Sequence, residues 1–157
     1  MTPLCYACSF GKIKMVKHLV ELGADLNNEK ENGGIPLCCA TTNGYGYIIK
    51  YLLEHGVEIN KTNEYDETSL HYACLINNDA LIKCFVKYGA DINKKNKDDE
   101  TLLFYACKNG NEVIVKYLVE HGTNIRGKDK KGKTPLFYAD ESGNEILVKY
   151  LNECIHH

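Results

Sequence analysis

A short signal recurs along this sequence at a fixed interval of 33 residues, at positions 2, 35, 68, 101 and 134. The five copies are Thr2-Pro3-Leu4, Ile35-Pro36-Leu37, Thr68-Ser69-Leu70, Thr101-Leu102-Leu103 and Thr134-Pro135-Leu136. A constant period of about 20–50 residues is typical of a repeat array in which each unit packs only on its neighbours. Such an array presents an extended surface and not a deep catalytic pocket.

Each signal predicts the start of a short helix. An alanine follows each leucine after three residues, at positions 7, 40, 73, 106 and 139, so both side chains lie on one helix face. A Thr-Pro beginning supplies an N-cap and then a proline in the first turn, where its missing N–H costs nothing. Gly11, Gly44 and Gly110 predict the ends of these helices, because glycine adopts the left-handed conformation of a helix stop. Asn77 takes this place in the third unit.

A second helix is predicted in each unit. In the fourth unit, apolar residues at 114, 115, 118 and 119 form one stripe of an amphipathic helix over residues 113–121. A glycine at 23, 56, 89 and 122 ends this helix, and a polar loop rich in Asn, Asp, Gly and Lys then predicts a turn. We therefore expect a single domain with repeats at residues 1–29, 30–62, 63–95, 96–128 and 129–157.

Two segments resemble the ankyrin repeat family most closely, Leu70-His71-Tyr72-Ala73 and Gly89-Ala90-Asp91-Ile92-Asn93. The resemblance covers essentially the whole chain. It implies an all-α solenoid of stacked helix-turn-helix units with protruding β-hairpin-like turns, curved and monomeric, which binds another protein through a concave face. The family's histidine is present only at position 71, and we expect more apolar contact at its replacements, Cys5, Cys38, Phe104 and Phe137.

Composition excludes several classes of function. The chain carries 19 Lys and Arg against 21 Asp and Glu, so no net field attracts nucleic acid or an anionic membrane. No apolar run approaches the roughly 20 residues of a membrane span. Equivalent cysteines in adjacent repeats are expected ~8–10 Å apart, beyond the ~7 Å Cα limit for a disulfide. Eight unbridged thiols indicate a reducing compartment, so we expect the cytoplasm, with the nucleus as the other intracellular possibility.

Cys5 and Cys8 form a Cys-x-x-Cys at a helix start, a spacing found in zinc and redox sites. Zinc would need a second matched pair, and a redox pair would need a βαβ setting, which is absent. The repeat alignment instead places both thiols in columns of small, buried packing residues. No catalytic triad, phosphate loop or His-Glu-x-x-His pattern occurs. We therefore expect no enzyme activity, metal or other cofactor, and zinc or redox chemistry at Cys5/Cys8 is the weaker alternative.

The resemblance implies contact residues at the turn tips and at the exposed ends of the first helices. Leu75 and Ile76 interrupt a polar row, with Tyr65 in the same unit and Phe10 farther along. Buried apolar side chains commonly carry the binding energy at an interface, so this group is the predicted hot spot. Local packing that compensates for Asn77 is the alternative. The predicted partner-binding residues are Phe10, Asn43, Glu64, Tyr65, Glu67, Leu75, Ile76, Lys97, Lys108, Asn109, Lys130, Lys131 and Lys133, and the turn positions also include Glu31, Asn32, Gly34, Asp98 and Glu100.

Charge differs between the predicted turns. The third repeat's turn carries Glu64, Asp66 and Glu67, whereas the last turn has five basic residues, at 126, 128, 130, 131 and 133, against Asp129. This polarity would orient a partner, and solvated turn tips are the plainer alternative. The leading hypothesis is a non-catalytic protein-protein interaction module. A structural spacer or tether within a larger protein is the alternative, and we expect neither nucleic acid nor a membrane as partner.

Overall fold

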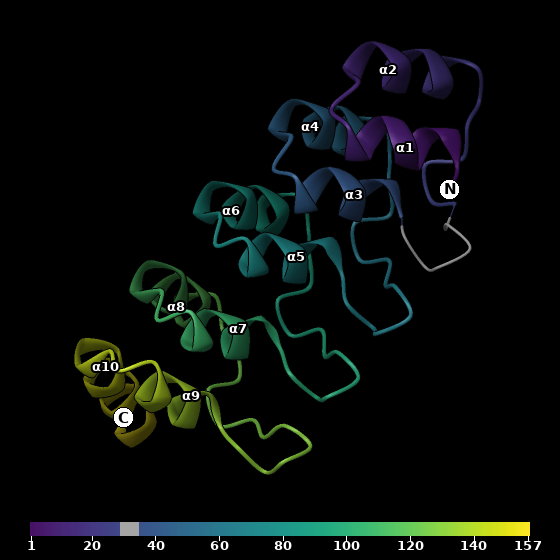
Figure 1. Cartoon of the computed structure of the whole chain (residues 1–157). Helices are drawn as coiled ribbons and strands as arrows, with labels where there is room; N and C mark the ends of the chain where they lie inside the picture. Colours follow the sequence, from purple (N-terminus) through teal and green to yellow (C-terminus); the bar gives the residue numbers. More distant parts are fainter. Residues whose placement is uncertain (29–34) are drawn as a thin grey trace. The chain divides into compact units, whose positions relative to one another are not determined.

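The computed structural model describes residues 1–28 and 35–157. Within these ranges the chain forms ten helices in five pairs and no strand (Figure 1), so the predicted all-α repeat solenoid is confirmed. The turn positions Glu31, Asn32 and Gly34 lie outside the described residues. The pairs are α1 (Pro3–Ser9) with α2 (Ile13–Glu21), α3 (Pro36–Thr42) with α4 (Gly46–Glu54), α5 (Ser69–Leu75) with α6 (Asp79–Lys87), α7 (Leu102–Lys108) with α8 (Glu112–Glu120), and α9 (Pro135–Glu141) with α10 (Glu145–His156).

The described chain divides into two compact units, Met1–Ala90 and Asp91–His157. In the first unit α1, α3 and α5 pack in one row, and each packs on its own second helix, α2, α4 or α6 (Figure 1). In the second unit α7 packs on α9, and these helices pack on α8 and α10 respectively. Residues 36–41 of α3 and 102–107 of α7 are all buried, so these two first helices expose only their C-terminal ends.

The first helices begin and end as their sequence signals predict. Thr2 Oγ1 accepts a hydrogen bond from the Cys5 N–H at 3.1 Å, and Pro3 occupies the first turn of α1. At the other end, Gly110 has a φ of +65° and Asn77 a φ of +55°, so both adopt the left-handed helix stop. The predicted second helix of the fourth repeat begins one residue earlier than expected, at Glu112, and ends at Glu120.

The repeating leucine and alanine columns form the core of both units. All five alanines are inaccessible to solvent, and the leucines are buried in the first four repeats. Leu136, in the last repeat, is only half-buried, and Phe137 beside it is 37% exposed, whereas the equivalent Phe104 is 1% exposed. The expected apolar contact at the histidine column therefore forms at Phe104 and is partial at Phe137, because no further described helix covers α9.

The cysteine columns are packing positions, as predicted. Six of the eight thiols are buried, Cys5 and Cys8 among them, and the described residues contain no disulfide bond. Burial raises the pKa of Cys38 and of Cys107 to about 12, which keeps both thiols protonated and poorly nucleophilic at neutral pH. In the described part of the chain, no group of three or more His, Cys, Asp or Glu side chains is placed to hold a metal ion. No helix in that part has the length and apolar character to cross a bilayer.

Candidate functional site

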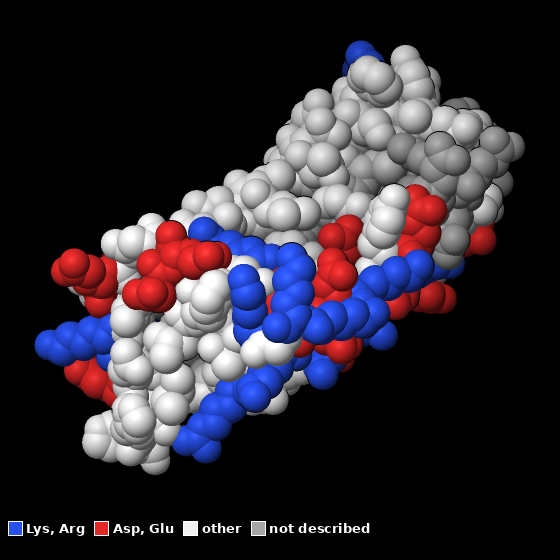
Figure 2. All heavy atoms as spheres, turned by 60° about the horizontal axis from the view of Figure 1, so that its bottom comes forward, with Lys and Arg blue, Asp and Glu red and all other residues white. Residues whose placement is uncertain are grey.

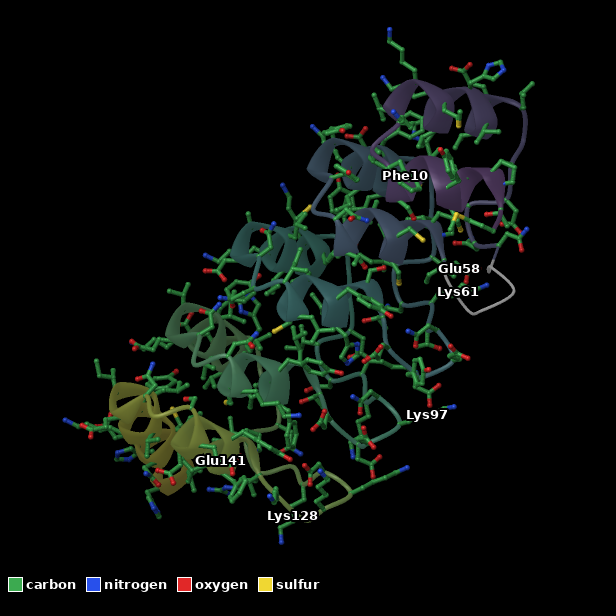
Figure 3. The ribbon with its side chains drawn as sticks, viewed as in Figure 1. Phe10, Glu58, Lys61, Lys97, Lys128 and Glu141 are labelled. Atoms are coloured by element: carbon green, nitrogen blue, oxygen red, sulfur yellow. The ribbon has the colours of Figure 1, made fainter. Side chains whose placement is uncertain are left out.

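The first unit exposes large apolar side chains at the C-terminal ends of its first helices. Phe10, labelled in Figure 3, caps α1 and is 54% exposed. Its ring centre lies 4.7 Å from that of Tyr6. Leu75 is the last residue of α5 and is 52% exposed, and Ile76 caps that helix and is 38% exposed. Local packing therefore covers only part of Leu75 and Ile76. We call Phe10, Leu75 and Ile76 the helix-end apolar group.

Asn43 lies between these residues in the row of first helices, but its side chain forms a hydrogen bond within its own helix. It caps α3, and its Nδ2 donates to the Cys39 carbonyl at 3.0 Å. The Thr41 and Thr42 hydroxyls donate in the same way to the carbonyls of Leu37 and Cys38, at 2.7 and 2.8 Å. The end of α3 therefore satisfies carbonyls of its last turn with side chains, Asn43 among them.

The turn of the third repeat is held from its base by Asn63. Its Oδ1 accepts the backbone N–H groups of Tyr65 and Glu67 at 2.9 and 3.0 Å, and its Nδ2 donates to the Tyr72 hydroxyl at 2.8 Å. Tyr65 is consequently presented at the tip with 57% of its surface exposed, and Glu64 beside it is exposed. Glu67 is half-buried and accepts a hydrogen bond from Asn63 at 3.2 Å, so this predicted contact residue has a structural role in the turn.

The same pattern of hydrogen bonds holds the two turns of the second unit. Asn96 accepts the N–H groups of Asp98 and Glu100 at 2.9 and 3.0 Å and donates to the Tyr105 hydroxyl at 2.7 Å. The repeat alignment missed this pairing, although a signal was present. An Asn or Asp stands nine residues before a Tyr in the last three repeats, as Asn63-Tyr72, Asn96-Tyr105 and Asp129-Tyr138.

In the last repeat the base of the turn is a carboxylate. Asp129 accepts the N–H groups of Lys131 and Lys133, both at 2.9 Å, and the Tyr138 hydroxyl at 2.5 Å. Burial alone would raise the pKa of Asp129, but the hydrogen bonds from Tyr138 and the two backbone groups outweigh it and lower the pKa. The same bond to Asp129 is the main cause that raises the pKa of Tyr138 to about 12. Asp129 is therefore ionised at neutral pH and serves the fold.

Lys108 joins the first helix of the fourth repeat to its turn. Its Nζ lies 2.5 Å from Glu100 Oε1 and 4.6 Å from the centre of the Tyr138 ring. Glu100 is only 8% exposed, so the expectation of a solvated turn residue is wrong, because Lys108 and Asn96 neutralise and bind it beneath the turn. Hollows of about 290 and 330 Å³ flank the Lys108–Tyr138 pair, the first also lined by Glu141 and Ser142 and the second by residues of both turns.

The remaining predicted residues of the second unit divide by exposure. Lys97, Lys130 and Lys131 are exposed on the turns, and Asn109 is exposed at the end of α7. Lys133 is half-buried, with its Nζ 4.1 Å from the centre of the Phe137 ring. On the face that Figure 2 presents, several basic side chains gather together with acidic side chains beside them.

The predicted residues therefore form one set in each unit. The first unit contributes the helix-end apolar group with Tyr65 and Glu64 at a turn tip, and the second contributes lysines on two turns. Asn43, Glu67, Lys108 and Lys133 make internal contacts that limit what they offer to a partner.

Comparisons with known proteins agree with this architecture. A family model described as Ankyrin repeats (3 copies) matches residues 1–63 and 70–156, and one described as Ankyrin repeats (many copies) matches residues 43–86. A search of the curated proteins gives no match. The ranges matched by the first model include both helices of all five pairs, apart from the first residue of α5.

Proposed function

Because the chain belongs to the ankyrin repeat family, whose members are generally non-catalytic protein-protein interaction modules, we propose that it recognises a partner protein through its first helices and turn tips. The helix-end apolar group of the first unit is the proposed centre of this contact. Tyr65 and Glu64 at the neighbouring turn tip would lie at its edge, where aromatic and polar side chains add contact area. A reducing compartment, cytoplasm or nucleus, fits the six buried thiols.

The exposure of Leu75 and Ile76 is the observation that carries the proposal. Fully burying an aliphatic side chain stabilises by about 1.5–3 kcal/mol. Scaled by the exposed fractions of 52% and 38%, covering both side chains contributes about 1.5–2.5 kcal/mol to a complex. This free energy corresponds to a roughly 10- to 60-fold change in Kd. Two side chains can therefore decide whether the module retains its partner.

Quantitative affinity capture from a cell lysate tests the proposal. The wild-type chain is compared with Leu75→Ala/Ile76→Ala and with Met15→Ala/Leu22→Ala. This control removes two exposed apolar side chains, 45% and 71% exposed, from α2 and its cap. We expect the wild type and the control to retain the same proteins and the Leu75/Ile76 variant to lose them. A cooperative thermal transition and a wild-type circular dichroism spectrum in both variants show that the fold is kept.

The alternative function, a spacer or tether in a larger protein, gives a different result in the same experiment. A tether retains no specific protein, and substitution of Leu75 and Ile76 then changes nothing. Retention of the same proteins by all three chains would refute the proposed contact, because it would place the interface elsewhere on the module.

A further inference from the structure

Four lysines of the second unit, Lys97, Lys128, Lys130 and Lys131, form an exposed set that we call the lysine turn face. All four lie on or beside the two protruding turns, and Figure 3 shows Lys97 and Lys128 directed away from the helices. Their ammonium groups make no ion pair with any residue that the structure describes. They are therefore charges that the described fold itself does not use.

Three other basic residues of the second unit are engaged within it. Lys108 pairs with Glu100, Lys133 lies over the Phe137 ring, and the Arg126 guanidinium donates to the Ile155 carbonyl. The nearby carboxylates differ in the same way. Asp129 is buried and accepts backbone N–H groups of its turn, and the buried Glu100 carboxylate accepts from Asn96 and Lys108. Among residues 97–100 and 128–133, Asp98 and Asp99 are therefore the carboxylates left to offset the four lysines.

The lysines are carried on a fixed backbone. Asn96 and Asp129 each hold two backbone N–H groups of their own turn. The two turns are also joined to each other, because the Lys130 N–H donates to the Asp98 carbonyl at 3.0 Å. Lys97 and Lys130 consequently project from neighbouring turns whose spacing is set, which lowers the entropy cost of a multipoint contact.

From these observations we infer that the lysine turn face docks an acidic, extended segment of the partner protein. This inference deepens the proposed function, since it assigns a chemical character to part of the partner. Carboxylates spaced along such a segment meet several ammonium groups in turn, and this attraction speeds the encounter and fixes the direction of the segment. Single-stranded nucleic acid fits less well, because the turn residues 97–100 and 128–133 contain no aromatic side chain on which a base could stack.

The inference is tested by titration of the whole chain with a fluorescent peptide of alternating glutamate and serine. The variant is Lys130→Gln/Lys131→Gln, and the matched control is Lys116→Gln/Lys149→Gln, which removes the same charge from exposed positions on α8 and α10 of the same unit. Loss of two exposed ion pairs should weaken peptide binding about 5-fold in the variant. The control should change it less than 2-fold, because attraction at that distance is screened by salt.

Two further probes decide the partner class and separate this inference from the proposed function. A glutamine-serine peptide should not bind, and a thymidine oligonucleotide of the same charge should bind more weakly than the acidic peptide. Tighter binding of the oligonucleotide, or equal peptide binding by the Lys130/Lys131 variant and its control, would overturn the inference. The Leu75→Ala/Ile76→Ala variant should bind the acidic peptide as tightly as the wild type. The peptide titration therefore tests the lysine turn face even if the helix-end apolar group does not bind the partner.

Discussion

Replacement of Asn96 by alanine should destabilise the second unit more than the equivalent change at Asn63 destabilises the first. Asn96 is 8% exposed, and its side chain satisfies the Glu100 N–H in a buried setting and the Asp98 N–H in a partly buried one. A buried donor left without an acceptor costs about 1–3 kcal/mol, and a partly buried one about 0.5–1 kcal/mol. The expected loss at Asn96 is therefore about 1.5–4 kcal/mol.

Asn63 makes the same pattern of bonds in a wetter setting. Its acceptor bonds to Tyr65 and Glu67 are exposed or only partly buried, so water replaces them at lower cost. We expect Asn63→Ala to cost about 1–2 kcal/mol. An exposed position, Asn28→Ala, serves as the matched control and should stay within about 0.5 kcal/mol of the wild type.

Urea unfolding followed by circular dichroism measures these differences. With a slope of about 2 kcal/mol per molar urea, Asn96→Ala should lower the midpoint of the transition that includes the second unit by about 0.8–2 M. Amide hydrogen exchange gives a local check, since the Glu100 amide should lose protection in Asn96→Ala. If Asn96→Ala lies within about 0.5 kcal/mol of the wild type, or Asn63→Ala is the more costly change, the argument from burial is refuted.

Two further predictions concern single polar groups of the turns. Thr101 Oγ1 is buried with no hydrogen-bond partner among the described residues, whereas Thr68 Oγ1 lies 3.0 Å from His71 Nδ1. Thr101→Val should therefore leave the thermal midpoint unchanged or raise it, and Thr68→Val should cost about 1 kcal/mol; equal losses would contradict this reading. The lowered pKa of Asp129 means that its bonds to Tyr138 and the turn stabilise the fold above the ordinary aspartate pKa of 3.8 and are lost as pH falls through the folded-state value. The thermal midpoint should fall by more between pH 7 and about pH 3 in the wild type than in Asp129→Asn. Equal falls in the two proteins would show that the charge of Asp129 does not stabilise the fold.

The sequence predicted features that recur in every repeat. The Leu and Ala columns, the Thr-Pro helix starts and the left-handed residue at Asn77 follow from local rules, and the structure confirms them. Leu136 departs from its column because burial depends on a neighbouring repeat and not on the residue itself. Local pattern therefore predicts helices well and burial at the last repeat poorly.

The candidate site was harder to predict because its side chains contact residues that lie eight or nine positions away in the sequence. Glu100 was expected in solvent, but Lys108, eight residues later, draws it beneath the turn. The Asn96–Tyr105 bond spans nine residues and follows neither helical nor strand periodicity, so its signal is the recurrence of the same spacing in the last three repeats. Exposure of Leu75 and Ile76 was predicted from their register, whereas its extent required the packed neighbours of α5.

The central claim is that the module binds a protein through the helix-end apolar group. The most direct test is the Kd of the captured partner, measured by calorimetry against the wild type, Leu75→Ala/Ile76→Ala and Met15→Ala/Leu22→Ala. The account predicts a Kd that rises roughly 10- to 60-fold for the Leu75/Ile76 variant and less than about 2-fold for the control. A Kd that is unchanged in the Leu75/Ile76 variant, or that rises equally in both variants, would contradict it.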